Sequence, residues 1–276
     1  MRVTIIGAGA MGAAIGARLH SRGCTVLTLL EGRSTASRQR AADAGMVETD
    51  LAGVATSDLI LSIVPPSQAA AVADELAPLL AAHPHIAFCD ANALAPATKR
   101  AMAERLSTTG AAFSDGIIIG FPPQADGDGP RLYVCGEGAE TVARMGEYGV
   151  DVRTMPGAVG EAAALKMCYA ALNKGLTALT TAALLASHKA GVADALLAEF
   201  GISQNFLLDR ARRAVPQMYP KAARWVAEME EIADFMRDDA GEPASGEIWD
   251  AMAHFFDARA TATDSGEEQT IAALLT

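Results

Sequence analysis

Short apolar runs alternate with longer, alanine-rich segments through the first half of the chain. The runs are rich in β-branched residues, as in parallel strands that are buried on both faces. They cover residues 3–6, 25–30, 58–64, 86–90, 116–120, 131–135 and 150–153. Several of the segments between them repeat apolar residues at helical spacing. Because strands that alternate with helices build a parallel sheet, this half predicts an α/β Rossmann domain with a doubly wound, mostly parallel sheet.

The pattern changes after Met155-Pro156-Gly157. Beyond this point the sequence predicts helices only. Residues 158–189 are periodic, apolar and alanine-rich, which predicts one long, largely buried helix. Further helices are expected at 191–200, from 203, at 220–237 and at 248–259, with a loop at 239–245. We therefore predict two domains, a Rossmann domain at residues 1–155 and an all-helical domain at residues 156–276.

Three glycines follow the first predicted strand in the spacing G-x-G-x-x-G: Gly7, Gly9 and Gly12. In such a turn the first glycine permits the tight bend, the second lets the backbone approach a pyrophosphate, and the third lets helix and strand pack closely. The free N–H groups at the helix N-terminus favour the same anion. We predict a dinucleotide site that includes Gly7, Ala8, Gly9, Ala10, Met11 and Gly12. The end of the strand at 58–64 adds Val64, Pro65 and Pro66.

The end of the second strand carries two opposed signals for the adenosine ribose. An acidic side chain there suits the 2′-hydroxyl of NAD, whereas an arginine suits the 2′-phosphate of NADP. Glu31 is at about the right offset, and Arg33 and Ser34 lie just beyond Gly32. The glycine lets the loop wrap, so that Arg33 and Ser34 embrace a phosphate while Glu31 turns away. We favour NADP, with NAD as the alternative.

Composition and net charge limit the classes of molecule that the protein is expected to bind. Hydrophobic residues are 51% of the chain and charged residues 20%, which allows a sizeable core. The net charge of −11 argues against nucleic acid and anionic membranes but leaves an anionic substrate open. Lys166, Asn173 and Lys174 interrupt the longest apolar stretch, so no membrane span is expected. From the scattered cysteines and the lack of a signal-peptide pattern we expect a cytoplasmic protein with buried, reduced thiols and no metal site.

Four motifs occur in order along the chain. They are Gly7-Ala-Gly-Ala-Met-Gly12, Asp90-Ala-Asn-Ala-Leu-Ala-Pro96, Asp115-Gly-Ile-Ile-Ile-Gly120, and Gly160 followed by Lys166. Together they resemble the G-x-G-x-M-G, D-x-S/T-x-x-x-P, substrate and catalytic-lysine motifs of the β-hydroxyacid dehydrogenase superfamily, the group of 6-phosphogluconate and 3-hydroxyisobutyrate dehydrogenases. The chain looks most like a little-characterised branch with its own C-terminal helical domain of unknown function.

The resemblance implies roles for particular residues. Lys166 would be the general acid/base. Asp115, Gly116 and Ile117 would bind substrate, although Asp115 equally suits capping of backbone amides. Asn92 stands where the family has Ser or Thr and would contact the cofactor.

One departure from the family pattern concerns the residues after Lys166. Tyr169 and Ala170 occupy the positions where an asparagine is usual. Asn173 lies about two turns beyond Lys166 on the same helix face. Tyr169 and Asn173 are therefore candidate orienting and substrate-binding groups.

Lys166 lies on an otherwise apolar helix, where burial would favour the neutral amine that a general base needs. The alternative is a lysine that reaches solvent or pairs with Glu161. We expect an NADP-dependent oxidoreductase that interconverts a small hydroxy acid and its carbonyl form, in a homodimer built on the helical domain. The alternatives are an NADPH-dependent imine reductase and an NADP-binding sensor or scaffold without turnover.

Overall fold

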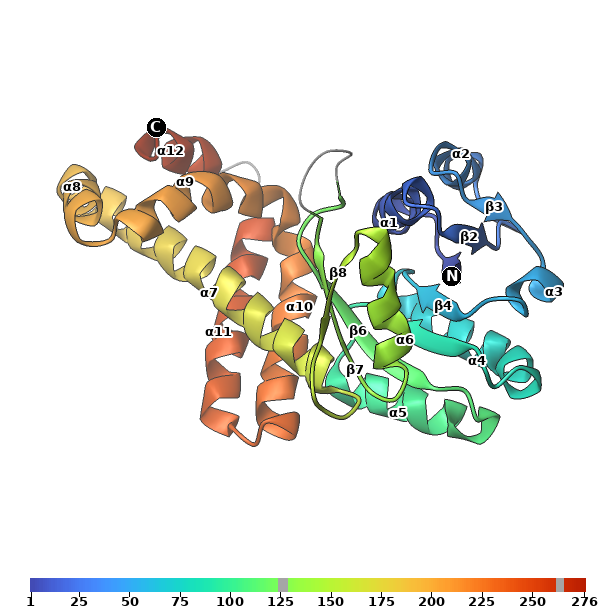
Figure 1. The fold of residues 1–276 in the computed structure, drawn as a ribbon. Coiled ribbons are helices and arrows are strands. Elements are labelled where there is room, and N and C mark those ends of the chain that lie inside the picture. Colours follow the sequence, from blue (N-terminus) through green and yellow to red (C-terminus); the bar gives the residue numbers. More distant parts are fainter. Residues whose placement is uncertain (124–128, 262–265) are drawn as a thin grey trace. The chain divides into compact units, whose positions relative to one another are not determined.

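The computed structural model describes residues 1–123, 129–261 and 266–276. It divides into two compact units, Met1–Lys166 and Met167–Thr276, which are described separately. The predicted boundary at 155–156 follows the last strand, whereas the first unit continues to Lys166, inside the long helix that comes next. Figure 1 shows the sheet of the first unit and the helices of the second.

Within the described residues the first unit holds an eight-stranded sheet of order β3-β2-β1-β4-β5-β6-β7-β8. The strands are β1 (Arg2–Ile6), β2 (Thr25–Thr28), β3 (Val47–Glu48), β4 (Leu59–Ser62), β5 (Ala87–Asp90), β6 (Phe113–Ile119), β7 (Arg131–Cys135) and β8 (Asp151–Thr154). All neighbours pair in parallel except β6 and β7. The predicted Rossmann fold with a mostly parallel sheet is confirmed. Strand order reverses between β1 and β4, where ligands bind in open sheets of this type.

Helices cover both faces of this sheet. They are α1 (Ala10–Ser21), α2 (Thr35–Asp43), α3 (Leu51–Val54), α4 (Pro66–Ala82), α5 (Pro96–Leu106) and α6 (Ala139–Ala143), with 3₁₀ turns at Ser107–Thr109 and Arg144–Tyr148. The strand at Val47–Glu48 and the helices at Leu51–Val54 and Ala139–Ala143 were absent from the sequence prediction. Each is too short for its periodicity to be recognised.

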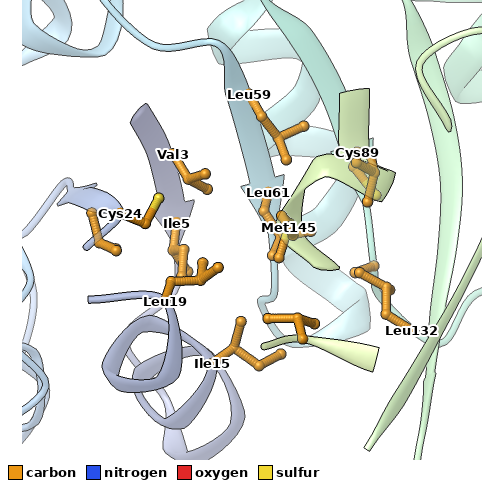
Figure 2. Packing of buried hydrophobic residues seen from close by; sticks show 14 of the residues in the cluster. Val3, Ile5, Ile15, Leu19, Cys24, Leu59, Leu61, Cys89, Leu132 and Met145 are labelled. Carbon is orange, nitrogen blue, oxygen red and sulfur yellow. The ribbon is translucent and has the colours of Figure 1, made fainter. Parts of the chain in front are cut away.

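Alternate residues of the central strands enter two separate cores. On one face Val3 and Ile5 of β1 pack with Ile15 and Leu19 of α1, as Figure 2 shows. On the other face, side chains of α4 and α5 pack against residues such as Ile60 of β4. Each fully buried aliphatic side chain contributes about 1.5–3 kcal/mol. Because both faces are covered, the strands read as continuous apolar runs in the sequence.

The long helix α7 (Glu161–Lys189) carries the chain into the second unit (Figure 1). The other helices of that unit are α8 (Ala193–Ser203), α9 (Asn205–Met218), α10 (Ala222–Asp234), α11 (Pro243–Ala260) and α12 (Glu267–Leu274), with a 3₁₀ turn at Tyr219–Lys221 and a π-helical turn at Phe235–Asp239. The predicted all-helical C-terminal region is confirmed. None of the described helices combines the length and apolar character needed to cross a membrane.

Three expectations for the helical region need correction. The predicted loop at 239–245 is shorter, because a proline at the first helical position starts α11 at Pro243. The long helix is not buried on every side, since Leu172 and Leu179 are 63% and 60% exposed. Cys168 is exposed on the same helix, in contrast to the three other cysteines, which are buried as expected.

Candidate active site

The glycine loop between β1 and α1 has the form that a dinucleotide requires. Gly7 has φ +107°, and a Cβ there would lie 2.1 Å from the Ile63 carbonyl oxygen. A Cβ on Gly12 would lie 2.1 Å from the Gly7 carbonyl oxygen, so helix and strand approach too closely for a side chain. A Cβ on Gly9 would meet no atom within 4 Å. The loop thus leaves open space beside the N-terminus of α1, where a pyrophosphate fits.

Other predicted residues of this loop line the same turn. Ala10 and Met11 begin α1, and their N–H groups belong to the first helical turn, which has no intrahelical acceptors. The Ala8 carbonyl accepts a hydrogen bond of 3.0 Å from Arg40 Nε of α2. No local pattern indicates that Arg40 holds the loop, because the contact joins segments about thirty residues apart. This bond fixes the loop against α2.

A cavity of about 1160 Å³ opens beyond the ends of β1 and β2. Its lining includes the apolar residues Ile6 and Leu29, one basic residue, Arg33, and four acidic residues, Glu31, Glu48, Asp50 and Glu75. Glu31 and Arg33, which give opposite signals for the ribose, therefore face one cavity. Ser34 is the N-cap of α2, where its Oγ accepts a hydrogen bond from Ser37 N at 3.2 Å. The first turn of α2 carries no acidic residue, which favours an anion there.

Asn92 connects the ends of β4 and β5. Its Oδ1 accepts a hydrogen bond from Val64 N at 2.7 Å. Its Nδ2 donates to Ser62 Oγ at 3.1 Å and to Asp90 Oδ2 at 2.6 Å. Asn92 is 3% exposed, so its amide shapes the turn that begins α4. Pro65 and Pro66, at the N-cap and first position of α4, are exposed at this turn.

Lys166 is held at the carboxyl end of β6. Its Nζ donates a hydrogen bond of 2.9 Å to the Ile118 carbonyl oxygen, and its side chain is partly buried. The structure therefore brings together the predicted catalytic lysine and the predicted substrate motif at 115–120. This placement follows from the packing of Ala162 in the first turn of α7 against Ile117 and Ile119 of β6.

Asp115 lies at the base of this arrangement and has no exposed surface. Its Oδ2 accepts hydrogen bonds from Gly160 N at 3.0 Å and from Ala163 N at 2.9 Å. These amides lie at the N-terminus of α7, where a carboxylate is favoured by the free N–H groups and the helix dipole. The sequence left two roles for Asp115, substrate binding and capping of backbone amides, and the structure shows the capping contacts. Gly116 and Ile117 are buried beside it.

Two buried thiols flank Asp115 without serving as nucleophiles. Cys135 Sγ accepts a hydrogen bond from Ala162 N at 3.4 Å and donates to the Ala158 carbonyl at 3.1 Å. Burial raises the pKa of both the Cys135 and the Cys89 thiol, which keeps them protonated at neutral pH. Among the described residues no group of three or more His, Cys, Asp or Glu side chains is placed to hold a metal ion.

Tyr169 and Asn173 lie farther along α7, in the second unit. Asn173 Nδ2 donates to the Tyr169 carbonyl oxygen at 3.0 Å, and the Asn173 carbonyl accepts from Arg210 Nη2 at 2.6 Å. The Tyr169 side chain is 46% exposed. Their predicted roles toward substrate stay predictions.

Lys99 of α5 is a residue that the sequence analysis missed. It has no exposed surface and lies between two aspartates, Asp90 at the end of β5 and Asp115 in β6. A signal was present, because Lys99 shares the spacing of the buried Met102 and Leu106. A lysine in the apolar stripe of a helix indicates a buried partner.

Comparison with known families agrees with this geometry. Residues 2–145, more than half of the chain, match the family described as the NAD binding domain of 6-phosphogluconate dehydrogenase. The chain belongs to this family. Residues 187–258 match a domain of unknown function (DUF1932), as the resemblance to a branch with its own C-terminal domain predicted. No curated protein sequence is significantly similar to the chain.

Solved structures extend the similarity of this 6-phosphogluconate dehydrogenase-like chain over its whole length. The conserved protein MTH1747, described as similar in structure to 3-hydroxyacid dehydrogenases, has 27% identity, a TM-score of 0.81 and 99% coverage of both chains. A 3-hydroxyisobutyrate dehydrogenase from Mycobacterium tuberculosis has 18% identity, a TM-score of 0.73 and coverage of 99% and 98%. An imine reductase variant from Myxococcus stipitatus in complex with NAD⁺ has 20% identity, a TM-score of 0.57 and coverage of 100% and 99%. The last two share the fold.

Proposed function

We propose that the protein is an NADP-dependent oxidoreductase that interconverts a small hydroxy acid and its carbonyl form. The observation that carries the proposal is the hydrogen bond from Lys166 Nζ to the Ile118 carbonyl. It holds an amine at the carboxyl end of a strand in an NAD(P)-binding fold. Such sheets bind their ligands at that edge.

Lys166 Nζ is the group that moves a proton in this proposal. A bound nicotinamide supplies the acceptor or donor of hydride. In the oxidative direction Lys166 Nζ takes the proton of the substrate hydroxyl, and in the reductive direction it returns a proton to the carbonyl oxygen. The Ile118 carbonyl orients Nζ, and Asp115 fixes the helix turn from which Lys166 extends.

NADP is the nucleotide that we propose, on the strength of Arg33. Arg33 lines the cavity beyond β2 next to the start of α2, whose first turn has no acidic residue. An arginine beside a helix N-terminus suits a 2′-phosphate. Glu31 lines the same cavity. If its carboxylate bound the ribose 2′-hydroxyl, the protein would prefer NAD instead.

A homodimer is also proposed, on the strength of one face of α7. Tyr169, Leu172 and Leu179 lie on that face with exposed fractions of 46%, 63% and 60%. Their spacing of three and seven residues places them in a row along the helix. An apolar row of this kind marks an interaction surface.

The experiment is to follow reduced nicotinamide absorbance with a panel of hydroxy acids, keto acids and cyclic imines. Wild type is compared with Lys166→Ala and with Lys189→Ala, a matched control at the exposed end of the same helix. We expect hydroxy acid turnover that falls about 10²- to 10⁴-fold in Lys166→Ala and is unchanged in Lys189→Ala. Full activity of Lys166→Ala would refute the assigned role.

The same panel separates the second candidate, an imine reductase. The fold shared with the imine reductase from Myxococcus stipitatus is the observation that favours it. Turnover of cyclic imines alone would establish that activity. Tight NADPH binding without any turnover would instead indicate a sensor or scaffold.

A further inference from the structure

Three charged side chains without exposed surface meet beneath the candidate active site. They are Asp90 at the end of β5, Asp115 in β6 and Lys99 in α5. Lys99 Nζ lies 2.5 Å from Asp90 Oδ1 and 3.2 Å from Asp115 Oδ1. Two negative charges therefore share one positive charge inside the protein.

The ammonium group of Lys99 uses all three of its protons. It donates to Asp90 Oδ1 at 2.5 Å, to the Asp90 carbonyl at 2.7 Å and to the Gly116 carbonyl at 3.1 Å. Its attraction to Asp115 Oδ1 is therefore one of charge, and that oxygen makes no hydrogen bond. Lys99 thus acts as an internal cation that joins the ends of β5 and β6.

Each aspartate connects Lys99 to a different part of the site. Asp115 holds the backbone amides of Gly160 and Ala163, which precede Lys166 on α7 by six and three residues. Asp90 accepts a hydrogen bond from Asn92, whose Oδ1 in turn binds the Val64 amide at the start of the α4 turn. One lysine is therefore connected both to the helix that carries Lys166 and to the turn on the predicted nucleotide side.

We propose that Lys99 is a positioning residue, which balances Asp90 and Asp115 so that they hold the Lys166 helix and the nucleotide-side turn in register. The inference rests on the proposed function, because it assigns Lys166 the catalytic role. Burial of ionised groups is a poor means of gaining stability, since apolar residues of similar volume often serve as well. What the cluster provides is fixed geometry at both sides of the site.

The test compares Lys99→Met, which keeps the length of the side chain and removes its charge, with the double variant Lys99→Met/Asp115→Asn. The asparagine retains an oxygen for the amides of Gly160 and Ala163 and removes one of the two charges left unbalanced. Arg105→Met is the matched control, because Arg105 lies on the same helix in an exposed pair with Asp74.

Two readouts are measured: kcat and amide hydrogen exchange of the segment 158–166. In Lys99→Met we expect kcat to fall about 100-fold, because a small displacement of the reacting group has effects of that size. Exchange at Gly160 and Ala163 should accelerate about ten- to a hundredfold, because the Asp115 carboxylate loses the cation that balances it and holds their N–H groups less firmly. The double variant should recover part of both losses, and Arg105→Met should match wild type.

The outcomes discriminate between charge balance and packing. Lys99→Met with wild-type kcat and exchange overturns the proposal, as does a double variant no better than the single one. If Lys99→Met does not fold but the double variant does, the recovery of folding supports the proposal in the same way as a recovery of kcat. If neither variant folds, the proposal is overturned. Amide exchange does not need turnover, so it tests Lys99 even if the proposed hydroxy acid activity is absent.

Discussion

Gly9 and Gly12 should respond in opposite ways to the same substitution. A Cβ at Gly9 would meet no protein atom within 4 Å, and φ there is −74°, which any residue adopts. Gly9→Ala should therefore change the free energy of unfolding by less than about 1 kcal/mol. A Cβ at Gly12 would lie 2.1 Å from a backbone oxygen of Gly7, which has no flexible side chain to move aside. Overpacking of this kind costs about 1–3 kcal/mol.

The affinity for NADPH should respond in the reverse order, with the direct effect at Gly9. In Gly9→Ala the new methyl group fills the space through which the backbone approaches a pyrophosphate. Loss of one charge-assisted hydrogen bond is worth about 1.5–3 kcal/mol, or about a ten- to hundredfold weaker affinity for NADPH. Gly9→Ala should therefore be a stable protein that binds nucleotide poorly, whereas Gly12→Ala should be impaired first in folding.

Thermal unfolding and NADPH fluorescence titration measure the two effects on the same samples. For a unit of this size each kcal/mol corresponds to about 2–4 °C in Tm. Wild-type NADPH affinity in Gly9→Ala would refute the placement of the pyrophosphate. A Gly12→Ala variant with the Tm of wild type would show that α1 moves away from Gly7 without penalty.

Two further predictions concern the nucleotide and the dimer. Arg33→Ala should weaken NADPH about ten- to hundredfold and leave NADH within a few-fold, because only the 2′-phosphate is lost as a partner; equal losses for both nucleotides in steady-state assays would contradict the NADP assignment. Leu172→Asp should lower the mass in light scattering from dimer to monomer, because it buries a charge in the proposed interface, whereas Ile202→Asp, at a residue 81% exposed on α8, should not. A monomeric wild type would refute the dimer.

Local signals were sufficient for most of the fold. The strands β1 and β4 are buried on both faces, so each is visible in the sequence as a continuous apolar run. The glycine loop was equally clear, because its geometry depends on residues within one turn of chain. The strand β3 escaped prediction because two residues make no pattern, and it forms only through pairing with Leu27 and Thr28 of β2.

The candidate site was predicted less completely, because its contacts span long stretches of sequence. The motif resemblance located Lys166 and Asp115, but it could not show that the Asp115 carboxylate binds amides of α7. Lys99 and Arg40 carry no motif and acquire their partners only when distant segments meet. Lys99 is visible in the sequence only as a charge at a position where periodicity expects an apolar residue, whereas Arg40 is exposed and carries no such signal.

The position of Lys166 is determined twice from the same strand. The Ile118 carbonyl of β6 binds its Nζ directly, and Asp115 of β6 binds the amides of Gly160 and Ala163 that start its helix. One contact fixes the tip of the side chain and the other fixes its backbone. Because both depend on the register of β6 against α7, loss of either should weaken the other, and their effects on kcat should not add. The segment 115–120 therefore places the lysine, and its residues Ile117 and Ile119 pack against Ala162 in the first turn of the same helix.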